Sequence, residues 1–294
     1  MFFGVGEDEA VVTAEIWIER WRSRRSDRPV PDPQAAMLFV AGVAVLFFWA
    51  GSQLQLWLGE RGLLAAEWLL LFVPSVLVVS LYGFDPVRTL SLRKPSGLGV
   101  LGSVLLIMGA VPLVWFIGWI QTFIFPVPWE LLEGLEDLVT ADTMGRLVWL
   151  LLLLAVTPAV CEEILFRGML LGGTRTLQPW RMIVLNGVVF GAFHLSFETA
   201  IRFVPTATLG MVIAWAVWRT GSIWAGALMH FLNNGAIVAL ASAPAAQKLF
   251  ATPDAPPPWW LVPVGAVLFA LGARILLRHQ TPVGVDAYTL IEES

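Results

Sequence analysis

The sequence predicts an all-α membrane protein, a polytopic bundle of about eight transmembrane helices with an interior polar site. Of its 294 residues, 57% are hydrophobic and 14% are charged, and the mean hydropathy is +0.76. Since a soluble domain carries roughly 25% charged residues, this chain has too few charges to cover a water-facing surface. Its net charge of −4 argues against a nucleic-acid-binding protein, which would present a basic face.

Eight apolar runs follow one another along the chain, and we expect each to form a membrane helix. They are residues 36–58, 63–83, 98–125, 147–171, 182–195, 203–218, 223–241 and 259–277. The fifth and sixth runs are shorter than a full span of about 20 residues. Their ends must therefore pack against protein, with the polar connection 196–202 dipping into a cavity.

Lysine and arginine residues in the connections predict the topology, because they gather on the cytoplasmic side of a membrane. Both tails and the second, fourth and sixth connections carry arginine, whereas the third connection is acidic. An even number of spans with both termini cytoplasmic fits this pattern. The frequent Trp, Ala and Arg residues are typical of a GC-rich bacterium, so we expect a multi-pass protein of a bacterial inner (plasma) membrane.

The chain divides into four predicted parts. Residues 1–34 lack the apolar core of a cleaved signal peptide, and their basic stretch 14–28 is predicted to lie on anionic lipid as an amphipathic helix or to form a solvated tail. Residues 35–145 hold the N-terminal transmembrane helices, residues 146–245 the core, and residues 246–294 the last helix and tail. We expect an amphipathic helix at 126–143 and an irregular loop at 242–258 on the outer face.

Polar side chains within the apolar runs are few, and each ionisable one needs a partner or a function because it costs about 3 kcal/mol on insertion scales. We single out Glu162, Glu163 and Arg167 in the fourth run, His194 in the fifth, and His230, Asn233 and Asn234 in the seventh. Glu67 is one turn into the second run, and we expect it to reach the interface. Cys161, the single cysteine, is expected to be an inert thiol.

The spacing of the fourth run assigns its partners. Adjacent helical residues point about 100° apart, so we do not expect Glu162 and Glu163 to face the same neighbour. Glu163 and Arg167 are four residues apart and are predicted to form an ion pair, an arrangement that is most often a structural clamp. Glu162 is then the free carboxylate that faces the bundle interior.

Two histidines from other spans are predicted to meet Glu162. His230 and Asn234 are four residues apart and point into the same cavity, while Asn233 is expected to pack between helices. Phe190 precedes His194 by one turn and is expected to wall the pocket. Three spans thus converge on one polar site.

With these residues placed, the chain resembles the CPBP intramembrane protease family, also called the CAAX prenyl protease 2 or Abi family. The resemblance rests on three motifs in order: Glu-Glu-x-x-x-Arg ending at Arg167, Phe-x-x-x-His ending at His194, and His-x-x-x-Asn ending at Asn234. These motifs cover about a third of the chain, residues 148–241.

The resemblance implies an intramembrane endopeptidase that cleaves near the carboxyl terminus of lipidated or membrane-embedded proteins. Glu162 would be the general base that activates water, and His194 would hold that water. His230 and Asn234 would donate hydrogen bonds to the oxyanion. The implied partners are membrane lipids and a membrane-anchored or lipidated peptide or protein. Supporting roles fall to Glu163, Arg167 and Phe190.

A metal is the open question in this implied mechanism. One glutamate and two histidines also form a ligand set for catalytic zinc, which here would be Glu162, His194 and His230. The carboxylate assigned as base would then become a ligand. We therefore expect a glutamic protease without a cofactor, and a zinc metalloprotease is the alternative.

Two other classes of function use the same residues. A non-catalytic scaffold or bacteriocin-immunity protein would bind a peptide in the pocket. A proton-coupled transporter would use Glu and His as a proton relay, although the sequence shows neither broken helices nor paired half-repeats. The substrate is open between prenylated proteins, peptide pheromones or bacteriocins, and carboxyl-terminal sorting tails.

Overall fold

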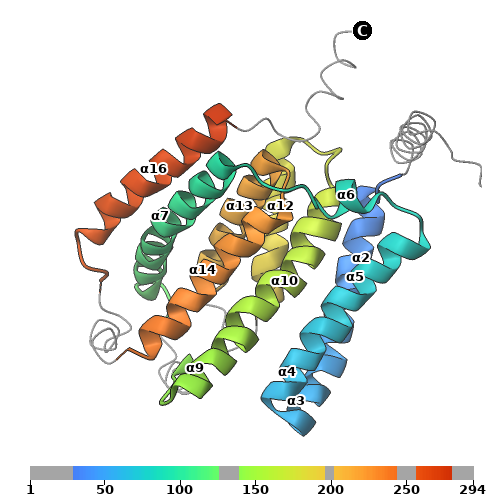
Figure 1. Cartoon of the computed structure of the whole chain (residues 1–294), viewed down its shortest axis with the longest axis horizontal. Helices are drawn as coiled ribbons and strands as arrows, with labels where there is room; N and C mark the ends of the chain where they lie inside the picture. Colours follow the sequence, from blue (N-terminus) through green and yellow to red (C-terminus); the bar gives the residue numbers. More distant parts are fainter. Residues whose placement is uncertain (1–28, 126–138, 196–201, 244–255, 280–294) are drawn as a thin grey trace, which may run out of the picture.

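The computed structural model describes residues 29–125, 139–195, 202–243 and 256–279, and these residues are mostly helical (Figure 1). Within them no strand occurs, and one isolated bridge joins Leu92 to Ser222. The expectations for the basic tail and for connections 126–138, 196–201 and 244–255 fall outside the described residues.

The helices follow the eight predicted runs. The first span comprises α2 (Pro33–Leu46), η1 (Phe47–Gly51) and α3 (Ser52–Leu58), and the second α4 (Glu60–Ala66), η2 (Glu67–Phe72) and α5 (Val73–Leu81), where η marks a π-helical segment. The short α6 (Pro86–Thr89) and the long α7 (Gly97–Thr122) follow. The fourth span comprises α9 (Met144–Leu151), η3 (Leu152–Val156), α10 (Thr157–Glu163), η4 (Ile164–Leu170) and α11 (Leu171–Gly173). The last four helices are α12 (Pro179–Phe193), α13 (Phe203–Thr220), α14 (Ile223–Ala241) and α16 (Leu261–His279).

Six of the described helices are long and apolar enough to cross a membrane. They are Pro33–Leu58, Glu60–Leu81, Gly97–Thr122, Met144–Gly173, Ile223–Ala241 and Leu261–Arg278. α12 and α13, which form the two runs expected to be short, are not among them, and they pack against each other. The protein is therefore an all-α, multi-pass membrane protein, as predicted.

Side-chain caps and prolines set where several helices begin. The Asp32 carboxylate accepts a hydrogen bond from the Ala35 amide at 2.9 Å, and Pro33 follows it at the start of α2. Ser96 and Thr143 cap α7 and α9 in the same way. These residues satisfy amide groups that have no partner inside the helix.

The fourth span lies at the centre of the bundle. Its segment α10 packs against α14 on one side and against η2 of the second span on the other (Figure 1). Of its most apolar stretch, 56% is buried in the protein, against at most 39% for the other five candidate spans. The fourth run is thus more buried in the protein than the other candidate spans, and polar residues on it can meet partners from other helices.

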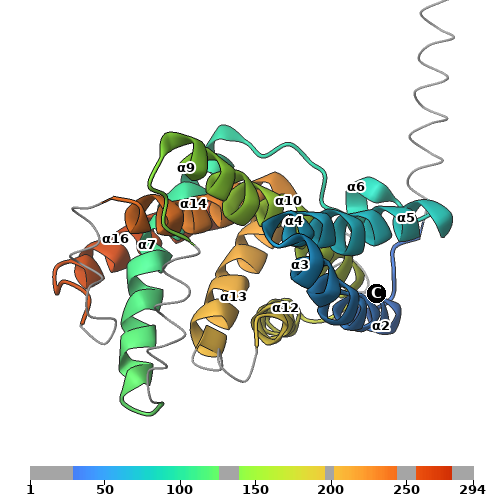
Figure 2. The same ribbon diagram turned by 90° about the horizontal axis from the view of Figure 1, so that it is seen from below.

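α7 and α16 pack closely against each other at one end of the bundle, where α7 also packs against α13 and α14 (Figure 2). Gly109 faces the backbone of Phe269, and Gly272 faces the backbone of Leu106, so neither position has space for a side chain. Small residues let membrane helices pack at short distance, where dispersion between backbones replaces a hydrophobic driving force.

Candidate active site

The polar site is built on the fourth span where its helix changes pitch. α10 ends at Glu163 and the π-helical η4 begins at Ile164, so the side chains of Glu162, Glu163 and Arg167 emerge at this junction. Their residues are 6%, 0% and 0% exposed. Single-turn π-helical segments within α-helices are frequent at functional sites.

Glu163 and Arg167 form the predicted ion pair. Arg167 Nη1 lies 2.8 Å from Glu163 Oε1, and Arg167 Nη2 donates to the Gly210 carbonyl of α13 at 3.1 Å. The guanidinium carbon also lies 4.3 Å from the centroid of the Phe190 ring. The arginine thereby ties three helices together and neutralises one of the two adjacent carboxylates.

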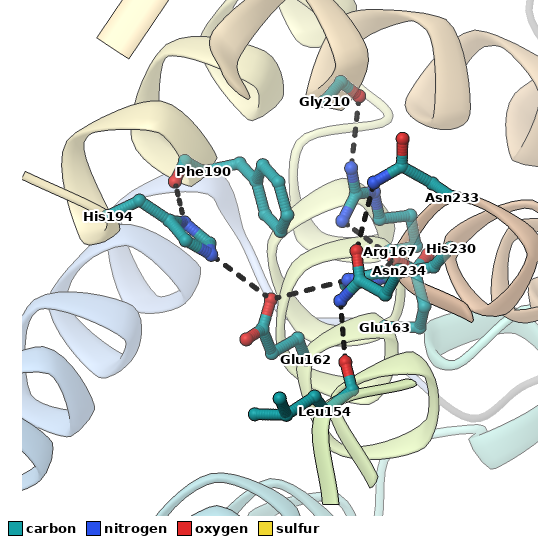
Figure 3. A network of polar contacts seen from close by, with 10 residues as sticks. All are labelled: Leu154, Glu162, Glu163, Arg167, Phe190, His194, Gly210, His230, Asn233 and Asn234. Carbon is teal, nitrogen blue, oxygen red and sulfur yellow. Dashed lines mark hydrogen bonds and ion pairs between the residues drawn. The ribbon is translucent and has the colours of Figure 1, made fainter. Parts of the chain in front are cut away.

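His230 of α14 contacts both glutamates, contrary to the sequence expectation that they would face different neighbours. Its Nδ1 lies 3.0 Å from Glu163 Oε1, and its Nε2 lies 4.0 Å from Glu162 Oε2 (Figure 3). An imidazole has two nitrogens on different edges, so one ring reaches two carboxylates that leave the helix about 100° apart.

His194 stands at the carboxyl end of α12, on the other side of Glu162 (Figure 3). Its Nδ1 lies 2.8 Å from the Phe190 carbonyl oxygen, and its Nε2 lies 3.7 Å from Glu162 Oε2. The side chain is 26% exposed, whereas those of Glu162 and His230 are 8% and 5% exposed. His194 therefore lies on the more open side of the site.

The hydrogen bonds at Nδ1 determine what the other ring nitrogens can do. A carbonyl oxygen and a carboxylate oxygen accept hydrogen bonds, so Nδ1 of both His194 and His230 carries the proton in the neutral ring. Each Nε2 then presents a lone pair toward Glu162 Oε2. That oxygen has no hydrogen-bond partner within the described part of the chain.

The spacing around Glu162 Oε2 suits a water molecule. Separations of 3.7 and 4.0 Å are too long for direct hydrogen bonds. A water about 2.8 Å from the carboxylate and from a ring nitrogen fits beside either pair. Such a water would donate one hydrogen bond to Glu162 and the other to a histidine Nε2.

Asn234 is positioned by a proline in the neighbouring span. Pro158 has no N–H, so it makes no helical hydrogen bond to the carbonyl of Leu154 four residues earlier. Asn234 Nδ2 donates to that carbonyl at 2.9 Å, and Asn233 Nδ2 donates to Asn234 Oδ1 at 2.9 Å. One N–H of the Asn234 amide is thus used, and its second N–H is left for another acceptor.

Aromatic and small residues shape the rest of the site. The Phe190 ring centroid lies 4.7 Å from that of His194 and 5.8 Å from that of His230, so it lies beside both imidazoles. A Cβ at Gly226 of α14 would lie 2.6 Å from Glu163 Oε2. Glycine at this position therefore lets α14 approach the glutamate.

Sequence reasoning missed two buried polar residues near the site. Asn186 of α12 is fully buried and donates from Nδ2 to the Phe166 carbonyl of η4 at 2.7 Å. Glu67 was expected at the interface but is 5% exposed and lies in η2, which packs against α10. In both cases the signal in the sequence was a polar residue inside an apolar run. Glu67 lies only one turn from the start of its run, and that depth is enough to bury it.

The donor types around Glu162 match those of catalytic zinc sites, including the hydrogen bonds at Nδ1 of both imidazoles. Within the described residues, however, no group of three or more His, Cys, Asp and Glu side chains is placed to hold a metal ion. We assign no chemistry to a metal.

Part of the chain matches a known protein family. Residues 144–236 match the family model of the type II CAAX prenyl endopeptidase Rce1-like proteins. No match was found among curated proteins or among solved structures. The matched segment contains all three motifs, from Glu162 to Asn234, and ends within α14. At the level of the family, the match supports a CAAX-protease-like membrane peptidase. It also confirms the resemblance of this segment to the CPBP intramembrane proteases.

Proposed function

We propose that this protein is an intramembrane endopeptidase that hydrolyses a peptide bond with a water molecule activated by Glu162. The observation that carries the proposal is the convergence of two imidazole Nε2 atoms on the unpartnered Oε2 of this buried carboxylate. A general base must lie within hydrogen-bond reach of the proton that it abstracts, and this geometry provides that reach through one water.

In the proposed reaction, Glu162 takes a proton from the water as the water oxygen attacks the scissile carbonyl carbon. His194, on the open side, holds the water through its Nε2 lone pair. The proton on Glu162 then passes to the nitrogen of the leaving amine, and Glu162 returns to its ionised form. This cycle balances protons without a covalent intermediate.

The negative charge that develops on the substrate oxygen must be stabilised by hydrogen-bond donors. Asn234 retains one amide N–H, and its position is fixed by the bond to Leu154. His230 serves as the second donor when its Nε2 carries a proton, and Glu163 Oε1, 3.0 Å from Nδ1, orients its ring. Removing one such donor typically costs about 10²-fold to 10³-fold in rate.

A cavity beside the site supports a substrate with an apolar group. It has a volume of about 290 Å³ and lies between α5, α10 and α14. Its walls are mostly apolar, and Glu163 and Ser80 contribute the charged and hydroxyl groups. We propose that substrates carry a lipid or an apolar side chain near the cleaved bond. The name of the matched family, a CAAX prenyl endopeptidase, agrees with such a substrate.

The proposal is tested with membranes from cells that carry the wild type, Glu162→Gln or Asp142→Asn. Asp142 is an exposed carboxylate outside the site and serves as the matched control. We expect uncleaved membrane-anchored precursors to accumulate with Glu162→Gln only, and their sequences identify the substrate. Unchanged processing with Glu162→Gln contradicts the proposal and favours a peptide-binding protein, such as the scaffold or immunity protein.

A further inference from the structure

Asn233 precedes the proposed oxyanion donor Asn234 on α14, and both residues are half-buried. The sequence predicted that Asn233 packs between helices. The structure also gives its side chain a polar contact, because Asn233 Nδ2 lies 2.9 Å from Asn234 Oδ1 (Figure 3). Asn233 is thus joined to the proposed site through the side-chain amide of Asn234.

Two hydrogen bonds determine which way the Asn234 amide points. The carbonyl oxygen of Leu154 can only accept, so the atom of Asn234 that lies 2.9 Å from it is the donor Nδ2. Asn234 Oδ1 then faces Asn233, and this oxygen accepts the hydrogen bond that Asn233 Nδ2 donates. The amide is therefore held at its nitrogen by the fourth span and at its oxygen by Asn233.

The second of these bonds matters for the direction of the remaining N–H. The last torsion of an asparagine side chain has a broad energy minimum, so a single hydrogen bond leaves the amide plane free to rotate. A second bond at the other end of the amide removes this freedom. The Asn234 N–H that does not bind Leu154 then has a defined direction, and donors fixed in advance stabilise an oxyanion without reorganising during the reaction.

We propose that Asn233 is a positioning residue that acts on the reaction through Asn234. Its N–H fixes the plane of the Asn234 amide and thereby aims the oxyanion donor. The inference rests on the proposed function, because it adds a residue to the same site. A residue that only packs between helices would instead change the stability of the fold, and its effect would not depend on the side chain at position 234.

The kinetic test is a double-mutant cycle on the purified protein, with a farnesylated peptide as the probe. Asn233→Leu keeps the shape of the side chain and removes its donor, and Asn233→Ala is a second variant that adds no bulk. We expect either change to lower kcat by about 3-fold to 10-fold, the worth of one typical hydrogen bond. KM should stay nearly unchanged, because the oxyanion forms only in the transition state. In a protein that already carries Asn234→Ala, either change should cost nothing further.

The outcomes separate the inference from the proposed function. Ile237→Ala, at an exposed position of α14, is the control and should match the wild type. A loss from Asn233→Leu that persists in full beside Asn234→Ala overturns the inference, and so does a wild-type kcat in both Asn233 variants. Asn234→Ala alone should lose about 10²-fold to 10³-fold in kcat. If it cleaves like the wild type, the oxyanion role in the proposed function fails, and the inference fails with it.

An NMR experiment tests the positioning without any substrate. The chain has three asparagines, Asn186, Asn233 and Asn234, so protein with isotope-labelled asparagine gives three side-chain amide signals, which single substitutions assign. In Asn233→Leu we expect the Asn234 signal to shift and its amide protons to exchange faster with water. The signal of Asn186, which donates to the Phe166 carbonyl at 2.7 Å, should stay in place and serves as the internal control. An Asn234 signal that neither shifts nor exchanges faster overturns the inference.

Discussion

Breaking the buried ion pair of the fourth span tests how the site is held together. We consider Arg167→Met, which keeps the apolar stem of the side chain and removes its charge. The change deletes the 2.8 Å contact with Glu163, the hydrogen bond to Gly210 and the stacking on Phe190. It leaves the Glu163 carboxylate buried, with His230 as its remaining partner at 3.0 Å.

The expected cost follows from burial. The side chains of Arg167 and Glu163 are 0% and 1% exposed, so neither is solvated when its partner is removed. Removing one partner of a buried pair typically costs about 3–5 kcal/mol of unfolding free energy. The double variant Glu163→Gln with Arg167→Met removes both charges, and we expect a coupling energy of about 1–3 kcal/mol between the two changes.

The assay is unfolding of the purified protein in mixed micelles by increasing SDS, followed by tryptophan fluorescence. Arg146→Met is the matched control, because Arg146 pairs with Glu60 at 2.6 Å but both side chains are about one-third exposed. We expect it to cost at most about 1 kcal/mol. If Arg167→Met and Arg146→Met are equally stable, or if the two changes in the double variant are strictly additive, the ion pair of Glu163 with Arg167 does not stabilise the fold as we expect.

Three further predictions follow from the packing and the donor set. Gly226→Ala places a methyl group 2.6 Å from Glu163 Oε2, so we expect it to destabilise the fold by about 1–3 kcal/mol and to slow cleavage. Gly42→Ala is the control, because Gly42 has open space around it, and we expect it to change neither stability nor cleavage. Gly109→Leu meets the backbone of Phe269, so we expect it to separate α16 from α7, visible as new protease sensitivity in α16. We expect exhaustive chelation to leave cleavage intact and metal analysis of the purified protein to find no bound metal. Loss of activity that added zinc restores would instead favour the zinc ligand set of Glu162, His194 and His230.

Composition and spacing predicted the fold and most of the site contacts. Eight apolar runs became helices, because an apolar stretch in lipid must satisfy its backbone hydrogen bonds internally. The four-residue spacing predicted the contact of Glu163 with Arg167, since both lie on one helical face.

Other contacts depend on the three-dimensional packing of separate spans. The bond from Asn234 to Leu154 needs both the carbonyl that Pro158 leaves free and the approach of α14 to η3. The joint contact of His230 with both glutamates depends on the position of its ring between them. Burial of Glu67 depends on how η2 packs against α10, which hydropathy along one span does not reveal.

The most direct test of the account is the kcat/KM of purified Glu162→Gln on a farnesylated peptide, relative to the wild type and to Asp142→Asn. The account predicts that Glu162→Gln loses about 10²-fold to 10⁴-fold in kcat/KM while its SDS unfolding curve stays that of a folded protein. Asp142→Asn should match the wild type. A folded Glu162→Gln protein that cleaves at the wild-type rate would contradict the assignment of Glu162 as the base.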